Sequence, residues 1–252
     1  MNANDVNDYG SLCAEMYEHL HENAPVDELG FYRSYAEKGK RILEALCGSG
    51  RFLIPLLDAG YDIEGIDSSF PMLAKLKAKR PNAQTTCSDI ASFETREKFD
   101  YVFITSGSVS LFTDDESLKS ALATVRNVLR PRGLFVFAVD TTANAEPDDE
   151  DYRITAEAPI DDSRTLILKT KNRFDAQTRT QFSPGIYELF ENGELVETEH
   201  MDFQTHLYSF GEIDGTLDEA GFKVNAVYSS FKKDPATGDG DEMLLYECTL
   251  KD

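Results

Sequence analysis

A buried apolar segment that leads into a glycine turn is the feature that most limits how this chain can fold. Residues 42–51 have the sequence Ile-Leu-Glu-Ala-Leu-Cys-Gly-Ser-Gly-Arg, and a second short apolar segment ends at Asp67. This arrangement suits a nucleoside-containing cofactor, because the glycines admit it close to the backbone and the carboxylate accepts hydrogen bonds from ribose hydroxyls. The pattern predicts an α/β fold with a Rossmann-like sheet.

The turn differs from a dinucleotide-binding turn at one position. After Gly48 and Gly50, a pyrophosphate-binding loop has a third glycine, where this chain has Leu53. Glu44, at the end of the first strand, repels phosphate and favours a cation such as the ammonium of an amino acid. A cofactor with a ribose, an adenine and a cationic amino-acid tail is S-adenosylmethionine, which the turn therefore predicts.

From Glu44 to Gly50 the chain resembles the first motif of the class I S-adenosylmethionine-dependent methyltransferases, an acid followed by spaced glycines. Gly48 and Gly50 match that motif, whereas Leu46 replaces its first glycine. The resemblance implies a seven-stranded, mostly parallel sheet with helices on both faces. It also implies that the segment from Glu44 to Arg51 binds the cofactor. The glycines alone are equally typical of a strand-to-helix turn without a ligand.

The residues around Asp67 are expected to hold the nucleoside. By the resemblance, Asp67 accepts hydrogen bonds from the ribose hydroxyls and Met72 packs on the adenine face. Ser68, in the N-cap region, and Pro71, in the first turn, are expected to start the next helix. The alternative is that Asp67 only caps this helix.

Two further strand ends add to the predicted cofactor site. After the third strand, the resemblance gives Asp89 a hydrogen bond from the adenine amino group and Ile90 a contact through its backbone N–H. The Ser-Asp pair is also a common turn signal. A buried strand over 99–104 is followed by Ser106 in a run of small hydroxyl residues, where cofactor and methyl acceptor meet in the family. The Asn/Asp-Pro-Pro-aromatic motif of enzymes that methylate amide or exocyclic amino nitrogens is absent from this run.

The remaining core elements follow the family order, and the last strand is expected to run antiparallel to the others. The methyltransferase core is predicted to comprise residues 37–145 and 209–252. Helices are expected over 115–129 and 212–220, strands over 134–139, 222–231 and 243–250, and a turn at 130–133.

Between the two parts of the core, residues 146–208 have the alternation of antiparallel strands. Strands are expected over 165–171, 186–191 and 194–208, the last two joined by the hairpin turn Asn192-Gly193. Many small-molecule members of the family carry such an insertion after the fifth strand. We therefore expect an antiparallel β cap over the catalytic face.

Two histidines in the last of these segments are candidate catalytic residues. Period-two alternation places His200 and His206 on one face of a strand over 194–208. If that face lines the cleft, either imidazole can act as a general base or orient the acceptor. The alternative is the solvent face of an antiparallel sheet.

The N-terminal residues 1–36 are rich in aromatic and acidic side chains. In similar enzymes such a helical segment covers the cofactor as a lid, and here Tyr17 or Tyr32 is expected to contact the methionine end. An aromatic face attracts a sulfonium through cation–π interaction. The same aromatic residues also suit simple packing of a helix onto the core.

Composition restricts the partners. The formal net charge is −21 and no basic run occurs, which argues against nucleic acid and anionic membrane surfaces as partners. The four cysteines have no spacing typical of a metal or redox site, so no metal is expected. Without a membrane-length apolar run or a signal peptide, the chain is expected to be cytoplasmic. A homodimer is left open.

The predicted reaction is in-line transfer of the sulfonium methyl group to an N or O atom of a small-molecule acceptor. The donor is already activated, so the protein mainly aligns the reactants and excludes water. An amine acceptor needs only to be neutral, whereas a hydroxyl needs a base. Two alternatives are a non-catalytic protein that binds S-adenosylmethionine and, given the absent third glycine less favoured, a nicotinamide-dependent oxidoreductase.

Overall fold

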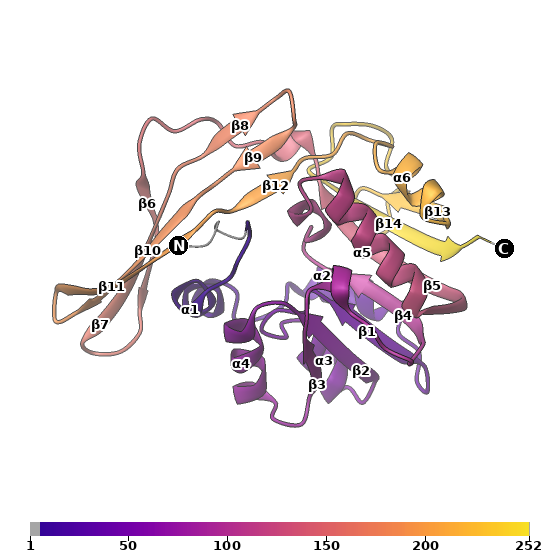
Figure 1. Cartoon of the computed structure of the whole chain (residues 1–252), viewed down its shortest axis with the longest axis horizontal. Coiled ribbons are helices and arrows are strands. Elements are labelled where there is room, and N and C mark those ends of the chain that lie inside the picture. The colour runs from indigo at the N-terminus through magenta and orange to yellow at the C-terminus, as the bar shows by residue number, and fades with distance from the viewer. Residues whose placement is uncertain (1–5, 252) are drawn as a thin grey trace.

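The computed structural model describes residues 6–251, and a seven-stranded sheet forms its centre (Figure 1). The strand order is β13-β14-β5-β4-β1-β2-β3. The strands β1 to β5 are parallel, and β14 runs antiparallel to β5, so the predicted mostly parallel Rossmann-like sheet is confirmed. The bounds are β1 Arg41–Ala45, β2 Asp62–Asp67, β3 Gln84–Cys87, β4 Phe99–Ile104, β5 Leu129–Asp140, β13 Phe222–Tyr228 and β14 Met243–Leu250.

Helices cover both faces of the sheet because the buried strands are apolar on both sides. On β1, Ile42 joins the core under one set of helices, and its neighbour Leu43 joins the core on the opposite face. One core includes α2 (Val26–Arg33), α3 (Leu53–Asp58) and α4 (Phe70–Lys79); the other includes α5 (Asp115–Val128) and α6 (Asp214–Glu219). Short 3₁₀ turns are η1 Ile90–Ser92, η2 Val109–Leu111 and η3 Thr142–Asn144. None of the helices within residues 6–251 is long and apolar enough to cross a membrane.

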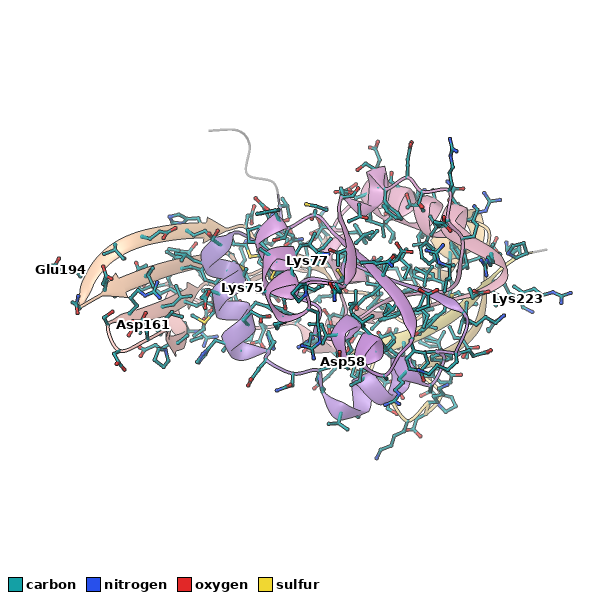
Figure 2. All side chains as sticks on the ribbon, turned by 90° about the horizontal axis from the view of Figure 1, so that it is seen from below. Asp58, Lys75, Lys77, Asp161, Glu194 and Lys223 are labelled. Carbon is teal, nitrogen blue, oxygen red and sulfur yellow. The ribbon has the colours of Figure 1, made fainter. Side chains whose placement is uncertain are left out.

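An antiparallel insertion follows β5, as expected, but it forms two sheets. Figure 1 shows these strands beside the core, and Figure 2 shows Asp161 and Glu194 at the far tip from Lys223. Asn192 and Gly193 both have positive φ values, 50° and 84°, as the predicted two-residue turn requires. One sheet has the order β11-β10-β7-β6, with β6 Arg153–Pro159, β7 Arg164–Thr170, β10 Gly185–Glu191 and β11 Glu194–Met201; the other has the order β12-β9-β8, with β8 Arg173–Asp175, β9 Thr180–Phe182 and β12 Gln204–His206.

The prediction of one strand over 194–208 was wrong. The chain leaves β10 after Met201 and pairs with β9 from Gln204 onward. Asn7 forms hydrogen bonds with the backbone on both sides of this change of partner. Its side-chain amide oxygen accepts from Gln204 N at 2.8 Å, and its backbone N–H donates to Asp202 O at 3.0 Å. The N-terminal segment thus fixes the change of partner, and the alternation of side chains does not continue across it.

Two smaller expectations also needed correction. The N-cap of α4 is Ser69, whose hydroxyl accepts from Met72 N, rather than Ser68, which lies one residue earlier. The expected turn at 130–133 lies inside β5 as an irregularity, where Phe99 pairs with Leu129 but Tyr101 pairs with Leu134. A positive φ of 65° at Arg132 allows the chain to loop out there without leaving the sheet.

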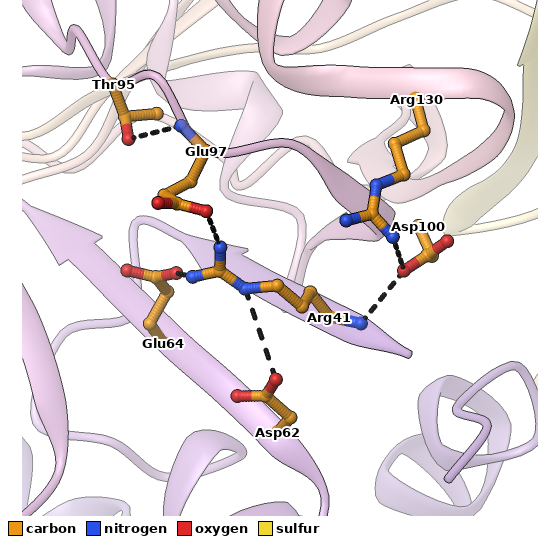
Figure 3. Close-up of polar contacts among 7 residues, drawn as sticks. All are labelled: Arg41, Asp62, Glu64, Thr95, Glu97, Asp100 and Arg130. Atoms are coloured by element: carbon orange, nitrogen blue, oxygen red, sulfur yellow. Dashed lines mark hydrogen bonds and ion pairs between the residues drawn. The ribbon is translucent and has the colours of Figure 1, made fainter. Parts of the chain in front are cut away.

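An ion-pair network closes the edge of the sheet at which the parallel strands begin (Figure 3). The guanidinium of Arg41, on β1, contacts Glu97 and lies 2.6 Å from Glu64 on β2. Its backbone N–H donates to Asp100, which also accepts from Arg130 at 2.8 Å. The network links β1, β2 and β4 near their amino ends. The carboxyl ends of these strands, at the opposite edge, are therefore free of it and available for a ligand.

Candidate functional site

A cavity of about 1000 Å³ lies at the carboxyl ends of β1 and β4. The strand order reverses between these two strands, and ligands of open α/β sheets bind at such a switch point. All twelve predicted cofactor residues lie within the described range 6–251, and of these only Gly50 is absent from the lining. The others in the lining are Tyr17, Glu44, Leu46, Gly48, Arg51, Asp67, Ser68, Met72, Asp89, Ile90 and Ser106.

Gly50 lies behind the turn and serves its packing. Its φ is +82°, and a Cβ there would approach Leu76 Cγ of α4 to 2.7 Å. Gly48, with a φ of +51°, faces the cavity beside Met72. The two glycines therefore differ in their surroundings: Gly50 allows the turn to pack closely on α4, and Gly48 lies in the cavity lining.

Leu46, which stands where the family motif has a glycine, has a backbone conformation that glycine adopts more readily than leucine. Its φ is +55°, in the left-handed region, which costs an L-residue roughly 1–2 kcal/mol. Ser106, at the end of β4, has the same φ of +55°. Its N–H donates to Glu28 Oε1 at 2.8 Å, and Arg51 Nη2 donates to its hydroxyl at 2.5 Å. Two residues with strained backbone thus border the cavity just after the ends of the adjacent strands β1 and β4, and backbone strain is common at functional sites.

Asp67 braces the turn and keeps acceptor capacity for a ligand. Its Oδ2 accepts from Gly48 N at 2.7 Å, and its Oδ1 accepts from Ser69 N at 2.8 Å. Burial raises the pKa of Asp67, and these two N–H groups partly offset that shift. Because each carboxylate oxygen accepts more than one hydrogen bond, both can also receive ribose hydroxyls.

Glu44 and Arg51 have complementary side chains, and each leaves part of its hydrogen-bonding capacity unused. Glu44 is 1% exposed, and its Oε2 has no hydrogen-bond partner among the described residues; the same holds for the buried Nε of Arg51. Burial raises the pKa of Glu44 well above its usual range, and Arg51 opposes that shift. Buried polar atoms normally have partners. An ammonium for Glu44 and a carboxylate for Arg51 fit the amino-acid end of S-adenosylmethionine.

The tyrosines of the N-terminal segment divide into two groups. Tyr17, on α1 (Ser11–Leu20), lines the cavity with its ring 5.7 Å from the Arg51 guanidinium and 4.7 Å from the His21 ring. Tyr32 is fully buried in the core, and its hydroxyl donates to Ile104 O at 3.1 Å. Of the two tyrosines expected at the methionine end, the structure therefore places Tyr17 in the cavity lining beside Arg51 and Tyr32 among the packing residues.

Asp89 caps a turn and lies in the cavity lining. Its carboxylate accepts from Ala91 N at 2.6 Å and caps η1, which is the turn role. Both Asp89 and Ile90 also line the cavity. The predicted contact with adenine stays a prediction that this position permits.

The described lining residues include neither His200 nor His206. His200 is exposed on β11, opposite Ile186 of β10. The Nε2 of His206 lies 2.7 Å from Glu212 Oε1, which also accepts from Arg179 at 2.6 Å. The catalytic role stays a prediction without geometric support, because the two histidines belong to different sheets.

Two residues near the cavity were missed by sequence reasoning. His21 lines it beside Tyr17, and partial burial together with the Arg51 charge lowers its pKa. Glu28, 5% exposed, holds Ser106 through the bond described above. An acid in the first turn of a helix usually signals only the helix dipole, so nothing in the sequence pointed to Glu28.

Among the described residues, the part of the cavity formed by the insertion is uncharged and combines polar groups with the apolar Leu168, Met201 and Phe203. Asn172 is 8% exposed and shows no side-chain hydrogen bond to the described residues, although it lines the cavity. Within residues 6–251, Arg51 is the only lysine or arginine in the lining, whereas Asp114 and Glu116 add carboxylates at the rim. The other polar lining residues from the insertion are Thr155, Thr170, Ser183 and Tyr187.

Asp140, at the end of β5, is expected to make stability depend on pH. Burial and the nearby Glu28 charge raise its pKa from 3.8 to about 6. The ionised form therefore destabilises the fold, and this effect develops as pH rises from about 4 through 6. The Asp140→Asn variant should be more stable than the natural protein at pH 8 by about 2–3 kcal/mol, and by less at pH 5.

Urea unfolding at pH 8 and pH 5 measures this difference. The exposed Asp162→Asn is the matched control and should leave the free energy of unfolding unchanged at both pH values. An Asp140→Asn gain that is equal at the two pH values, or absent, contradicts the titration of Asp140 in this range.

Comparisons with known proteins agree with the geometry. Residues 42–133 match the family model described as a methyltransferase domain. The chain is 31% identical to YqeM of Bacillus subtilis, a protein named as a methyltransferase, over 92% of this chain and 94% of the relative.

Solved structures share the fold over nearly the whole chain. An S-adenosylmethionine-dependent methyltransferase from Clostridium acetobutylicum superposes with a TM-score of 0.75 at 16% identity, covering 95% of this chain and 98% of that one. The sugar N-methyltransferase KedS8 from Streptoalloteichus has a TM-score of 0.73 at 16% identity, covering 100% and 99%. The chain therefore belongs to the class I S-adenosylmethionine-dependent methyltransferase family, and S-adenosylmethionine is its cofactor.

Proposed function

We propose that the protein transfers the methyl group of S-adenosylmethionine to a nitrogen or oxygen atom of a small molecule held under the β cap. The observation that carries this proposal is one cavity of about 1000 Å³ that extends from the charged groups at the strand ends to the neutral polar groups of the insertion. The bound cofactor supplies an activated methyl group. The protein aligns the two reactants and excludes water.

The charged end of the cavity suits the cofactor. Glu44 and Arg51 hold the ammonium and carboxylate, Asp67 holds the ribose, and Asp89 with Ile90 contacts the adenine. Met72 packs beside the adenine, and Tyr17 covers the methionine end. The proposed lid is residues 1–36, of which 1–5 lie outside the described residues, and the proposed cap is residues 146–208.

A nitrogen acceptor fits the cavity better than an oxygen acceptor. A hydroxyl needs a base at the methyl-transfer position, and the only histidine in the described lining is His21, next to the Arg51 charge. An amine reacts as its neutral form, which is in equilibrium with the protonated form that the carboxylates of Asp114 and Glu116 attract into the cavity. The likeness to a sugar N-methyltransferase supports the same choice. His200 and His206 have no role in this proposal.

Family membership removes the two alternative functions drawn from the sequence, a nicotinamide-dependent oxidoreductase and a non-catalytic cofactor-binding protein. A cytoplasmic location, a possible homodimer and the exclusion of nucleic acid and membranes as partners stay predictions from composition.

Calorimetry followed by a turnover assay tests the proposed function. S-Adenosylmethionine should bind the natural protein, and a panel of matched amines and alcohols should release S-adenosylhomocysteine with amines only. Turnover with alcohols but not amines would overturn the nitrogen acceptor. Absence of heat with S-adenosylmethionine would overturn the placement of the cofactor.

A further inference from the structure

Helix α1 is built as part of the cap rather than of the core. Its buried residues Leu12, Cys13 and Met16 form one cluster with Leu166, Tyr187 and Met201 of the insertion. The Sγ of Cys13 lies 3.5 Å from the Sδ of Met201. Figure 1 shows α1 between the strands of the insertion and α4. Helix α1 carries Tyr17, and its C-cap residue is His21; both line the cavity near Arg51. The helix itself packs on the insertion, which forms the other part of the cavity.

A carboxylate from the insertion caps this helix. The residue at its N-cap position, Gly10, provides no side-chain cap, and the first turn contains no acid. Instead, Glu199 of β11 accepts from Leu12 N at 3.0 Å through Oε2 and from Cys13 N at 2.8 Å through Oε1. A Cβ on Gly10 would come within 2.4 Å of Glu199 Cδ, so only glycine admits this approach. The carboxylate satisfies two free N–H groups and stabilises the helix dipole.

The opposite side of α1 is joined to the nucleoside-binding part of the core. Glu15 contacts Lys75, and Glu18 lies 2.7 Å from Lys79, both on α4. Just before α1, the carbonyl of Tyr9 accepts from the Ser69 hydroxyl at 2.7 Å, and the N–H of Ser69 donates to Asp67.

We infer that Glu199 is a positioning residue for the cofactor. From the β insertion it caps the N-terminus of helix α1 and so holds the lid against the site, which makes the affinity for the cofactor depend on the insertion. It contacts neither reactant. This inference rests on the proposed placement of S-adenosylmethionine against α1. By thermodynamic reciprocity, an acceptor that orders the cap strands also raises the affinity for S-adenosylmethionine.

Calorimetry with S-adenosylmethionine on Glu199→Ala, Glu199→Gln and Glu197→Ala tests the inference. Glu199→Ala should weaken binding about tenfold, whereas Glu199→Gln, which keeps one acceptor oxygen, should weaken it about threefold. Glu197 is exposed on the same strand, and its replacement should change binding less than twofold. The graded loss, with recovery by glutamine, distinguishes positioning of the lid from a general loss of stability.

A second variant keeps Glu199 and moves it away. In Gly10→Ala the new methyl group displaces the carboxylate, so binding should fall as in Glu199→Ala. Hydrogen exchange should become faster at Leu12 and Cys13 and stay slow at β4 in both variants. The inference is overturned if both variants bind S-adenosylmethionine with an affinity within twofold of the natural protein although hydrogen exchange shows that α1 has loosened. If the natural protein does not bind S-adenosylmethionine, the placement of the cofactor fails instead.

Discussion

Replacement of Asp67 by alanine is expected to weaken binding of S-adenosylmethionine by about 100-fold or more. The variant loses the two charge-assisted hydrogen bonds that Asp67 is proposed to accept from the ribose, each contributing about 1.5–3 kcal/mol. It also removes the acceptor for Gly48 N and Ser69 N, so the turn loses the brace that holds it open toward the ligand. Calorimetry measures the change in affinity.

The control for Asp67→Ala lies at the other end of the same strand. Asp62 is exposed and lies 4.0 Å from Arg41 at the far edge of the sheet, so Asp62→Ala should leave the affinity unchanged. Thermal unfolding of both variants separates loss of the brace from loss of the fold. An affinity of Asp67→Ala within fivefold of the natural protein contradicts the ribose contact and favours the helix-capping alternative.

The parallel part of the fold follows from local sequence signals. The apolar runs that became β1, β2 and β4, the glycine turn after β1 and the acids at strand ends each lie within a few residues of one another along the chain. Because parallel strands end at one edge, such signals also predict which side chains meet. That is why Glu44, Asp67 and Ser106 were brought together in the structure as the sequence indicated.

The parts that the sequence did not predict depend on contacts between distant segments. The strand over 194–208 changes sheets because Asn7 bonds to Gln204, 197 residues away. Tyr17 and Tyr32 have the same chemistry and lie on neighbouring helices, and only packing decides that one faces the cavity. Glu28 acquires its role from Ser106, 78 residues later. Alternation and composition contain no information on these pairings.

The charges of the chain are arranged along the cavity even though its net charge is simply acidic. Arg51 supplies positive charge at the cofactor end, carboxylates lie at the strand ends and rim, and the insertion contributes neutral groups. A phosphate on the acceptor would find no lysine or arginine other than Arg51 in the described lining. The arrangement therefore supports the proposed amine acceptor and argues against an acceptor that carries a phosphate.

The second large effect is expected at Arg51. In Arg51→Met the affinity for S-adenosylmethionine should fall about 100-fold, because the carboxylate of the amino-acid end is then buried without a partner. Methionine keeps much of the apolar stem and loses the guanidinium, whose carbon lies 5.7 Å from the centre of the Tyr17 ring and 5.1 Å from that of the Phe52 ring. Glu44→Gln should lower the affinity for S-adenosylmethionine about tenfold, because the ammonium of the cofactor then has no carboxylate partner.

The double variant of Arg51 and Glu44 distinguishes this account from a purely structural role. Arg51 opposes the rise that burial causes in the pKa of Glu44, so loss of Arg51 shifts that pKa further upward and weakens the attraction of Glu44 for the ammonium. Arg51→Met with Glu44→Gln should therefore bind about as weakly as Arg51→Met alone, which calorimetry measures as a non-additive cycle.

Decarboxylated S-adenosylmethionine supplies the matching chemical deletion. It lacks the carboxylate that Arg51 is proposed to hold, so the natural protein should bind it about 100-fold more weakly than S-adenosylmethionine. Arg51→Met should then bind the two ligands almost equally, because the group removed from the protein and the group removed from the ligand belong to one contact. Full additivity of the two deletions would show that Arg51 acts elsewhere, through Ser106 rather than on the cofactor.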